Sequence, residues 1–190
     1  MTEQNISLTI DGQAVTVPKE TTILEAARSV GIDIPTLCWA ENLTPVNVCR
    51  LCVVEADNSK ALVPACSRAC DAGSNIETNN ERVTKNRRMV LELLDSANDF
   101  SQSEELQDLM ANYEADSSRY SDNLAAHDEP KVEDDLFIRA YDRCVLCYKC
   151  VQACGEEAQF TFAIAIANRG FDARVSTEHD IPLPESACVY

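Results

Sequence analysis

The placement of its cysteines constrains this 190-residue chain more than any other feature. The ten cysteines form two groups, with the lone Cys188 near the C-terminal end. The first group contains Cys38, Cys49, Cys52, Cys66 and Cys70, and the second contains Cys144, Cys147, Cys150 and Cys154. The 73 residues between the groups contain no cysteine. Short gaps bring thiols together, so each group predicts a site for a metal or a metal cluster.

Composition argues against disulfides as the use of these cysteines. They make up about 5% of the chain, below the ~8–10% typical of secreted disulfide scaffolds. The first twelve residues have neither the basic nor the apolar stretch of a signal peptide, and no run approaches the ~18 apolar residues of a membrane span. We therefore expect reduced thiols, a cytoplasmic location, either free or peripheral to a membrane complex, and no direct membrane insertion.

The charge balance excludes another class of function. Asp and Glu number 32 against 16 Lys and Arg, which gives a formal net charge of −16. Such a chain repels phosphate backbones and anionic lipids. We expect no nucleic-acid partner.

The first group has the spacing C-x10-C-x2-C-x13-C through Cys38, Cys49, Cys52 and Cys66. Four thiolates, two for each iron, are what a [2Fe-2S] cluster requires, and a loop containing C-x2-C resembles the plant-type arrangement with a longer first gap. These four cysteines are the predicted ligands. Cys70 is left over, and we interpret it as a small buried hydrophobic residue.

The second group reads C-x2-C-x2-C-x3-C, the spacing of bacterial [4Fe-4S] ferredoxins. Cys144, Cys147 and Cys150 would hold one cluster, whereas the fourth cysteine of such a run, here Cys154, usually serves another. With Cys188 as the one remaining cysteine after the run, the ligand sets for one or two [4Fe-4S] clusters are incomplete. We expect a piece of a longer protein. The alternative is a complete chain in which Cys188 folds back to finish a single cluster.

Zinc is the other metal that proteins hold with four cysteines. Structural zinc sites commonly combine two separate C-x2-C knuckles. Neither cysteine group contains two such knuckles. A zinc protein without a redox role therefore stays as the less favoured alternative.

Hydrophobic patterning predicts several local elements. Alternating residues over 6–10 and 14–17 around Asp11-Gly12 predict a hairpin, and a capping box at Thr22 and Glu25 predicts a helix that stops at Gly31. The runs 51–56 and 61–65 predict a second hairpin. Residues 160–167 and 171–175 predict a third.

Two further helices are expected between the cysteine groups. Thr78 and Ser101 stand three residues before glutamates and are the predicted N-caps. The first of these helices has an apolar stripe that includes Val83 and Leu93, and its basic residues are interpreted as a solvated face. These basic residues are Lys85, Arg87 and Arg88.

The sequence resembles the N-terminal iron-sulfur region shared by NADH-quinone oxidoreductase large subunits, NAD-linked formate dehydrogenases and iron-only hydrogenases. The resemblance covers nearly the whole chain and rests on IPTLCWAENLTPVNVCRLCVVE, VPACS, RRMVLELL, YDRCVLCYKCVQAC and NRGFDARVST. It implies an α+β fold in three parts. These are a β-grasp [2Fe-2S] ferredoxin domain at 1–78, a helical connector at 79–135, and a partial bacterial-ferredoxin-like [4Fe-4S] domain at 136–190.

The resemblance also implies the ligand assignments. Cys38, Cys49, Cys52 and Cys66 match the [2Fe-2S] ligands, Cys144, Cys147 and Cys150 match three ligands of one [4Fe-4S] cluster, and Cys154 with Cys188 match two of the next. Many relatives have a further cluster bound by one histidine and three cysteines after RRMVLELL. The stretch DSANDFSQSEELQDLMANY has neither residue type, so we expect that cluster to be absent. Its absence and RGFDARVST favour the formate dehydrogenase branch.

The function predicted from these features is a relay of single electrons, with no catalytic centre in this chain. The resemblance implies a flavin- and NAD-binding partner subunit and a molybdopterin-type catalytic domain or subunit. The alternatives are the iron-sulfur subunit of an NADH-quinone oxidoreductase or a hydrogenase, and a free-standing ferredoxin-like carrier.

Overall fold

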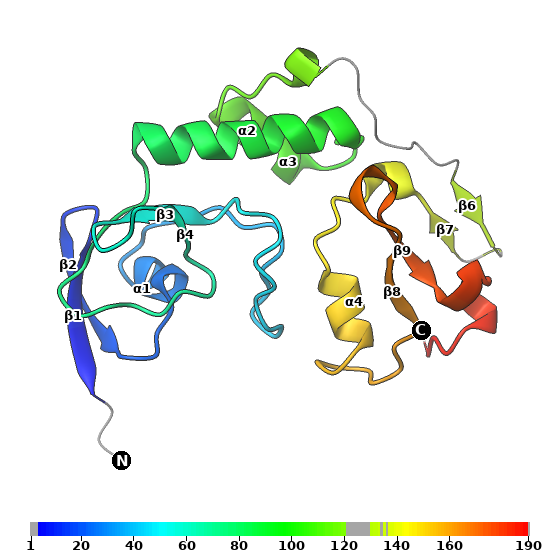
Figure 1. Cartoon of the computed structure of the whole chain (residues 1–190), viewed down its shortest axis with the longest axis horizontal. Helices are drawn as coiled ribbons and strands as arrows, with labels where there is room; N and C mark the ends of the chain where they lie inside the picture. Colours follow the sequence, from blue (N-terminus) through cyan, green and yellow to red (C-terminus); the bar gives the residue numbers. More distant parts are fainter. Residues whose placement is uncertain (1–3, 121–129, 134, 136, 190) are drawn as a thin grey trace. The chain divides into compact units, whose positions relative to one another are not determined.

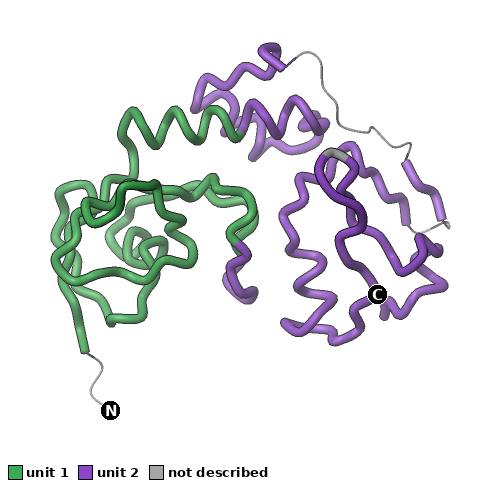
Figure 2. The backbone as a smooth tube through the Cα atoms, viewed as in Figure 1, with its two compact units in different colours: residues 1–39, 47–90 green, residues 40–46, 91–190 purple. Residues whose placement is uncertain are grey.

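The computed structural model of the chain describes residues 4–120, 130–133, 135 and 137–189 and divides into two compact units (Figure 1). Figure 2 colours unit 1, residues 1–39 and 47–90, and unit 2, residues 40–46 and 91–190. Helix α2 (Glu81–Ala97) starts in unit 1 and ends in unit 2. The three-part division at 78 and 135 stays a prediction. Part of its expected linker, 121–129, lies outside the described residues.

Unit 1 is built on a five-stranded mixed sheet with the order β2-β1-β5-β3-β4. β1 runs parallel to β5, and each other neighbouring pair is antiparallel. The strands are β1 (Asn5–Ile10), β2 (Gln13–Pro18), β3 (Val53–Ala56), β4 (Val63–Pro64) and β5 (Asn75–Glu77). With helix α1 (Ile23–Ser29) packed on this sheet, the α+β class is confirmed.

The first hairpin follows from its turn residues. Ile10 pairs with Gln13, which leaves Asp11 and Gly12 as a two-residue connection. Both have positive φ angles, 47° and 80°, as the tight turn that matches strand twist requires. The Asp11 carboxylate also accepts hydrogen bonds from the backbone N–H (2.7 Å) and hydroxyl (2.5 Å) of Thr78. The turn is thereby tied to the segment that leads into α2.

The core of unit 1 lies between α1 and the sheet. Thr22 caps α1 through the predicted capping box with Glu25, and Gly31 follows the helix with a φ angle of 78°. The cap sets the helix start, so its apolar face meets the sheet. The buried residues include Leu24 and Ala27 from α1, and Ile10, Val54 and Ile76 from the strands.

Two predicted helix caps are wrong. Thr78 binds Asp11 instead, and Asn80 Oδ1 accepts the Val83 N–H at 2.9 Å at the start of α2. For α3 (Glu104–Asn112) the N-cap is Ser103 rather than Ser101. Both sequences offer several polar capping residues within three positions, and the candidates that are not used bond elsewhere: Thr78 to the distant Asp11, and the Ser101 backbone N–H to Asp99 two residues before it.

Unit 2 has short elements and two separate two-stranded sheets. Its helices and strands after α2 are α3, β6 (Lys131–Val132), β7 (Ile138–Arg139), α4 (Lys149–Cys154), β8 (Ile164–Ala167) and β9 (Arg174–Thr177). Single 3-10 turns cover Ser117–Tyr120, Tyr141–Arg143, Gly170–Asp172, Glu178–Asp180 and Leu183–Glu185. The β8–β9 hairpin confirms the third predicted one, although its strands are shorter than predicted.

The segment before β8 differs from the predicted strand. Phe160 and Phe162 have left-handed φ angles of 57° and 52° and are 70% and 58% exposed. Their rings meet edge to face, with centroids 5.8 Å apart. This loop folds back on Cys154, because the Thr161 and Phe162 N–H groups both donate to the Cys154 carbonyl. In the described part of the chain, no helix has the length and apolar character needed to cross a membrane.

Candidate functional site

The first cysteine group is enclosed by unit 1. Cys38 and Cys49 lie in the loop between α1 and β3, Cys52 directly precedes β3, and Cys66 follows β4. Cys38, Cys52 and Cys66 are each at most 2% exposed, and Cys49 is half-buried. The strand ends and the loop therefore bring together the four predicted [2Fe-2S] ligands, which are far apart in sequence.

The four thiols perturb one another in two pairs. Interaction with the Cys49 thiol raises the pKa of Cys38, and the same interaction lowers the pKa of Cys49 to about 5. Interaction with the Cys66 thiol likewise lowers the pKa of Cys52 to about 7, and interaction with the Cys52 thiol raises the pKa of Cys66. The charges of Cys52, Cys38 and Cys49 also act on Cys66, so all four sulfurs share one electrostatic environment.

Nearby backbone N–H groups lower the pKa of three of these thiols. The donors are Cys49 and Val48 for Cys38; Leu51, Cys38 and Leu37 for Cys49; and Cys66 and Ala65 for Cys52. The loop makes this convergence with two left-handed residues, Asn47 and Arg50, whose φ angles are 59° and 57°. N–H donors around thiolates are the environment in which a negatively charged cluster is stabilised.

Asn47 is a site residue that sequence reasoning missed. Its Oδ1 accepts the Cys66 thiol at 3.3 Å and the Ser67 hydroxyl at 2.7 Å. A thiolate ligand cannot donate, so with Cys66 ionised this bond is lost unless the amide flips and presents its Nδ2 donors instead. Asparagine two residues before Cys49, in a loop that needs left-handed backbone, was the available signal.

The residues of the first group fit a [2Fe-2S] cluster. Such a cluster needs two thiolates for each iron, and the structure supplies two pairs in a buried, N–H-lined environment. Cys70 is 4% exposed, and burial raises its pKa to about 11. Its backbone N–H bonds to Thr21, and it lies in the core cluster, so its interpretation as a buried hydrophobic residue agrees with its surroundings.

The second group is more open. Cys150 is exposed, and Cys144, Cys147 and Cys154 are half-buried. Burial raises the pKa of Cys144 and of Cys150, and the charges of Cys144 and Cys147 raise the pKa of Cys150 further. Leu146 and Tyr148, between these cysteines, have left-handed φ angles of 51° and 66°. The structure thus brings three of the predicted ligands near one another on a tightly wound loop.

Cys154, at the end of α4, faces a different set of groups. Its sulfur accepts the Ala163 N–H at 3.0 Å and lies 3.3 Å from the Thr161 hydroxyl. Cys188 is half-buried beyond the last 3-10 turn, where its N–H donates to Ser186 Oγ. Among the described residues, no three His, Cys, Asp or Glu side chains are arranged around one metal ion. The ligand sets of both groups therefore stay predictions.

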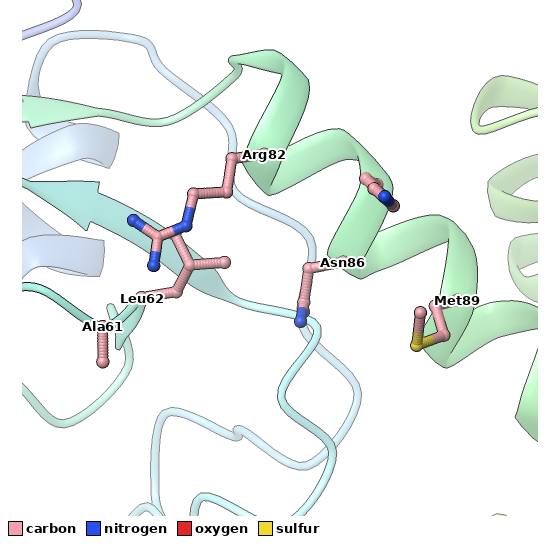
Figure 3. Close-up of a pocket in the computed structure, with 6 residues that line it drawn as sticks. Ala61, Leu62, Arg82, Asn86 and Met89 are labelled. Atoms are coloured by element: carbon pink, nitrogen blue, oxygen red, sulfur yellow. The ribbon is translucent and has the colours of Figure 1, made fainter.

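A hollow of about 360 Å³ lies beside α2 in unit 1 and contains none of the thiols. Its lining residues are Ala61, Leu62, Arg82, Lys85, Asn86 and Met89. Figure 3 shows Arg82 reaching from α2 toward Leu62. Arg82 also binds Glu55 at 2.7 Å and the Lys60 carbonyl at 2.7 Å, so the hollow is bordered by a surface ion pair.

Comparison with known proteins identifies the first domain. Residues 3–81 match the family model of the 2Fe-2S iron-sulfur cluster binding domain. The chain is 34% identical over 196 residues to the NADP-reducing hydrogenase subunit HndD of Solidesulfovibrio fructosivorans, covering 96% of this chain and 33% of that protein. It is 31% identical over 179 residues to an NADH-quinone oxidoreductase subunit of Rhizobium meliloti, covering 90% of this chain and 21% of that protein.

Over nearly its whole length the chain is therefore similar to part of an NADP-reducing hydrogenase subunit and to part of an NADH-quinone oxidoreductase subunit, with the 2Fe-2S domain match confined to residues 3–81. A third relative is the alpha subunit of the NADPH-Fe(3+) oxidoreductase of Geobacter sulfurreducens, 34% identical over 198 residues, which cover 96% of this chain and 22% of that protein. A crystal structure of an NAD+-reducing [NiFe]-hydrogenase has a TM-score of 0.84 and 26% identity, covering 97% of this chain and 80% of that one. The chain spans a fifth to a third of the length of these three curated relatives.

Proposed function

We propose that this chain relays single electrons, through clusters held by both cysteine groups, between a catalytic centre and a flavin- and NAD-binding partner subunit. The observation that carries the proposal is the paired arrangement of Cys38 with Cys49 and of Cys52 with Cys66 inside a domain of the 2Fe-2S family. A cluster bound there would accept and release one electron at a time. The protein contributes burial, ligation and N–H donors.

The four proposed ligands of the first group act as two pairs. Cys38 and Cys49 would hold one iron, and Cys52 and Cys66 the other, because the largest influence on the pKa of each thiol comes from the other thiol of its pair. Burial excludes water from three of these sulfurs. Exclusion of water slows hydrolysis and oxidation of the ligands, which a relay that turns over many times requires.

The second group extends the relay in this proposal. Cys144, Cys147 and Cys150 would hold one [4Fe-4S] cluster, while Cys154 with Cys188 would contribute to another. The supporting observation is the contact set of Cys154, whose sulfur faces Thr161 and Ala163.

The test is anaerobic purification followed by measurement of iron, acid-labile sulfide and EPR signals after reduction with dithionite. The proposal expects a coloured protein that bleaches on reduction and shows a [2Fe-2S] signal in the wild type. A colourless protein that contains zinc and no labile sulfide would contradict the proposal in favour of the zinc alternative.

We propose NAD-linked formate oxidation as the parent activity. The support is the RGFDARVST stretch and the lack of cysteine and histidine between Asp95 and Tyr113. In this proposal a molybdopterin-type centre supplies the electrons. The second candidate is a hydrogenase, which the likeness to the NADP-reducing hydrogenase subunit and to the NAD+-reducing [NiFe]-hydrogenase favours.

The parent activity is decided by the complex isolated from its source. Complexes are captured on an affinity tag fused to the native chain, and reduction of the clusters is followed after addition of formate, H2, NADH or NADPH. Formate-dependent bleaching supports the first candidate, and H2-dependent bleaching the second. Isolation of the chain alone, without a flavoprotein, would instead support a free carrier.

A further inference from the structure

Arg87 is a cation buried on the inner face of α2. Its exposed fraction is 2%, in contrast to the solvated face predicted for this part of the helix. The prediction is wrong for Arg87 because helical periodicity places it on the same face as Val83 and Leu91, which are both fully buried. Burying a charge is costly unless the surroundings compensate it, so its position calls for a physical reason.

The guanidinium of Arg87 binds the chain on both sides of a proposed cluster ligand. Its Nε donates to the Leu51 carbonyl at 3.0 Å, and its Nη2 donates to the Val53 carbonyl at 3.0 Å. The residue between these two carbonyls is Cys52, itself 2% exposed. Two bonds from one planar group fix both the position and the direction of this short segment. Arg87 therefore holds the backbone on both sides of Cys52.

The charge of Arg87 also matters for electron transfer. Two ferric ions, two sulfides and four thiolates sum to a formal charge of about −2, and reduction by one electron makes it about −3. A cation held in the low-dielectric interior beside the ligand segment stabilises the more negative state, and solvent screens it little. The Leu51 and Val53 carbonyls that accept these two bonds are neutral groups.

We propose that Arg87 is a positioning residue and counter-charge of the [2Fe-2S] site, which orients Cys52 and favours the reduced state. This inference rests on the proposed role of Cys52 as a ligand. It assigns a redox function to a residue outside the cysteine motifs. Helix α2 thereby contributes to the site even though it carries no ligand.

The test compares neutral and cationic replacements of Arg87 in the full chain. Arg87→Met removes the charge and both hydrogen bonds, Arg87→Gln removes the charge and keeps an N–H donor, and Arg87→Lys keeps the charge. The midpoint potential of the [2Fe-2S] signal is measured by EPR-monitored titration. We expect both neutral variants to favour the oxidised state by about tenfold, a shift of ~59 mV to lower potential for one electron. Arg87→Lys should stay within about threefold of the wild type, or ~28 mV.

The matched control is Arg82→Met, the same change of charge on the same helix. The Arg82 side chain is 48% exposed and paired with Glu55 at the border of the hollow in Figure 3. Solvent and Glu55 screen its charge, so its potential should equal that of the wild type. Equal shifts in Arg82→Met and Arg87→Met would overturn the proposal, as would unchanged potentials in both neutral Arg87 variants.

Whether each Arg87 variant retains the cluster distinguishes the charge of Arg87 from its positioning role. If only the neutral variants lose the cluster while Arg87→Lys retains it, the requirement for charge is supported. If all three variants lose it with the fold intact by circular dichroism, the counter-charge is overturned and the positioning role alone remains. A wild-type chain that binds no cluster would contradict the proposed function itself, which is a distinguishable result.

Discussion

The two cysteine groups are surrounded by different amounts of protein. In unit 1 three of the four proposed [2Fe-2S] ligands are at most 2% exposed, and a sheet, a helix and a loop enclose them. In unit 2 one of the four cysteines of the second group is exposed and three are half-buried, and the nearby elements are two-stranded sheets and a six-residue helix. The comparison shows that ligand spacing and ligand enclosure are separate properties. Spacing is local, whereas enclosure needs a core.

The largest expected effect comes from a substitution that disrupts the first cysteine group and leaves the second intact. Cys52→Ser should abolish the [2Fe-2S] EPR signal and remove about two irons and two sulfides per chain, because the pair with Cys66 is lost. Any signal from the second group should persist. Cys70→Ala is the matched control, since Cys70 is equally buried yet outside the pairs, and it should retain both signals. A Cys52→Ser protein with its full iron content would refute the assignment.

The difference in burial between the two units can be tested next, through the stability of each unit. Leu24 in α1 is fully buried, so Leu24→Ala should lower the free energy of unfolding of unit 1 by about 2–5 kcal/mol. The control is Phe160→Ala in unit 2, which removes a larger side chain that is 70% exposed and should cost less than about 1 kcal/mol. Urea unfolding followed by the absorption of each cluster measures the two units separately. Equal losses from both substitutions would contradict the difference in enclosure.

A buried carboxylate should make unit 2 sensitive to acid. Burial raises the pKa of Glu133, but the Leu183 N–H and the charges of Arg139 and Lys131 outweigh burial and hold it below its ordinary value of 4.5. A depressed folded pKa means stability that is present above pH 4.5 and lost as the pH falls through the lower folded value.

Glu133→Gln removes this contribution. The variant should be less stable than the wild type at pH 7, and the difference should shrink as the pH falls below about 4. Urea unfolding of unit 2 between pH 3 and 7 measures this difference in free energy of unfolding. Glu178→Gln is the control, because Glu178 is 85% exposed. If the wild type exceeds Glu133→Gln in free energy of unfolding by the same amount at every pH, the depressed pKa of Glu133 does not contribute to stability.

The smallest expected effect concerns hydrogen bonds to sulfur in the second group. Thr161→Val removes the hydroxyl 3.3 Å from the Cys154 sulfur and keeps the shape of the side chain. Loss of a donor to a thiolate should lower the potential of the cluster that Cys154 serves, by less than about tenfold in the equilibrium constant, or ~59 mV. Thr161→Ser should restore the wild-type value. A potential that follows side-chain size rather than the hydroxyl would exclude this role.

Local sequence signals predicted much of the fold. The Asp11-Gly12 hairpin and the α1 capping box follow from φ preferences and side-chain bonds within a few residues, so tertiary context had little to change. The N-cap of α2 was mispredicted because Thr78 has a partner 67 residues away in Asp11. The exposed loop of Phe160 and Phe162 was mispredicted as strand because its backbone bonds to Cys154 instead of a neighbouring strand.

By itself, the sequence predicted the chemistry: cysteine spacing indicates thiolate sites, and the net charge argues against polyanionic partners. Only the tertiary structure decided which thiols pair, that Asn47 contacts Cys66, and that Arg87 lies inside against Leu51 and Val53. The physical reason is the distance along the chain between the residues that interact. Ligand identity and turn preference are properties of single residues and their neighbours, whereas pairing, burial and charge compensation arise from segments that meet through folding.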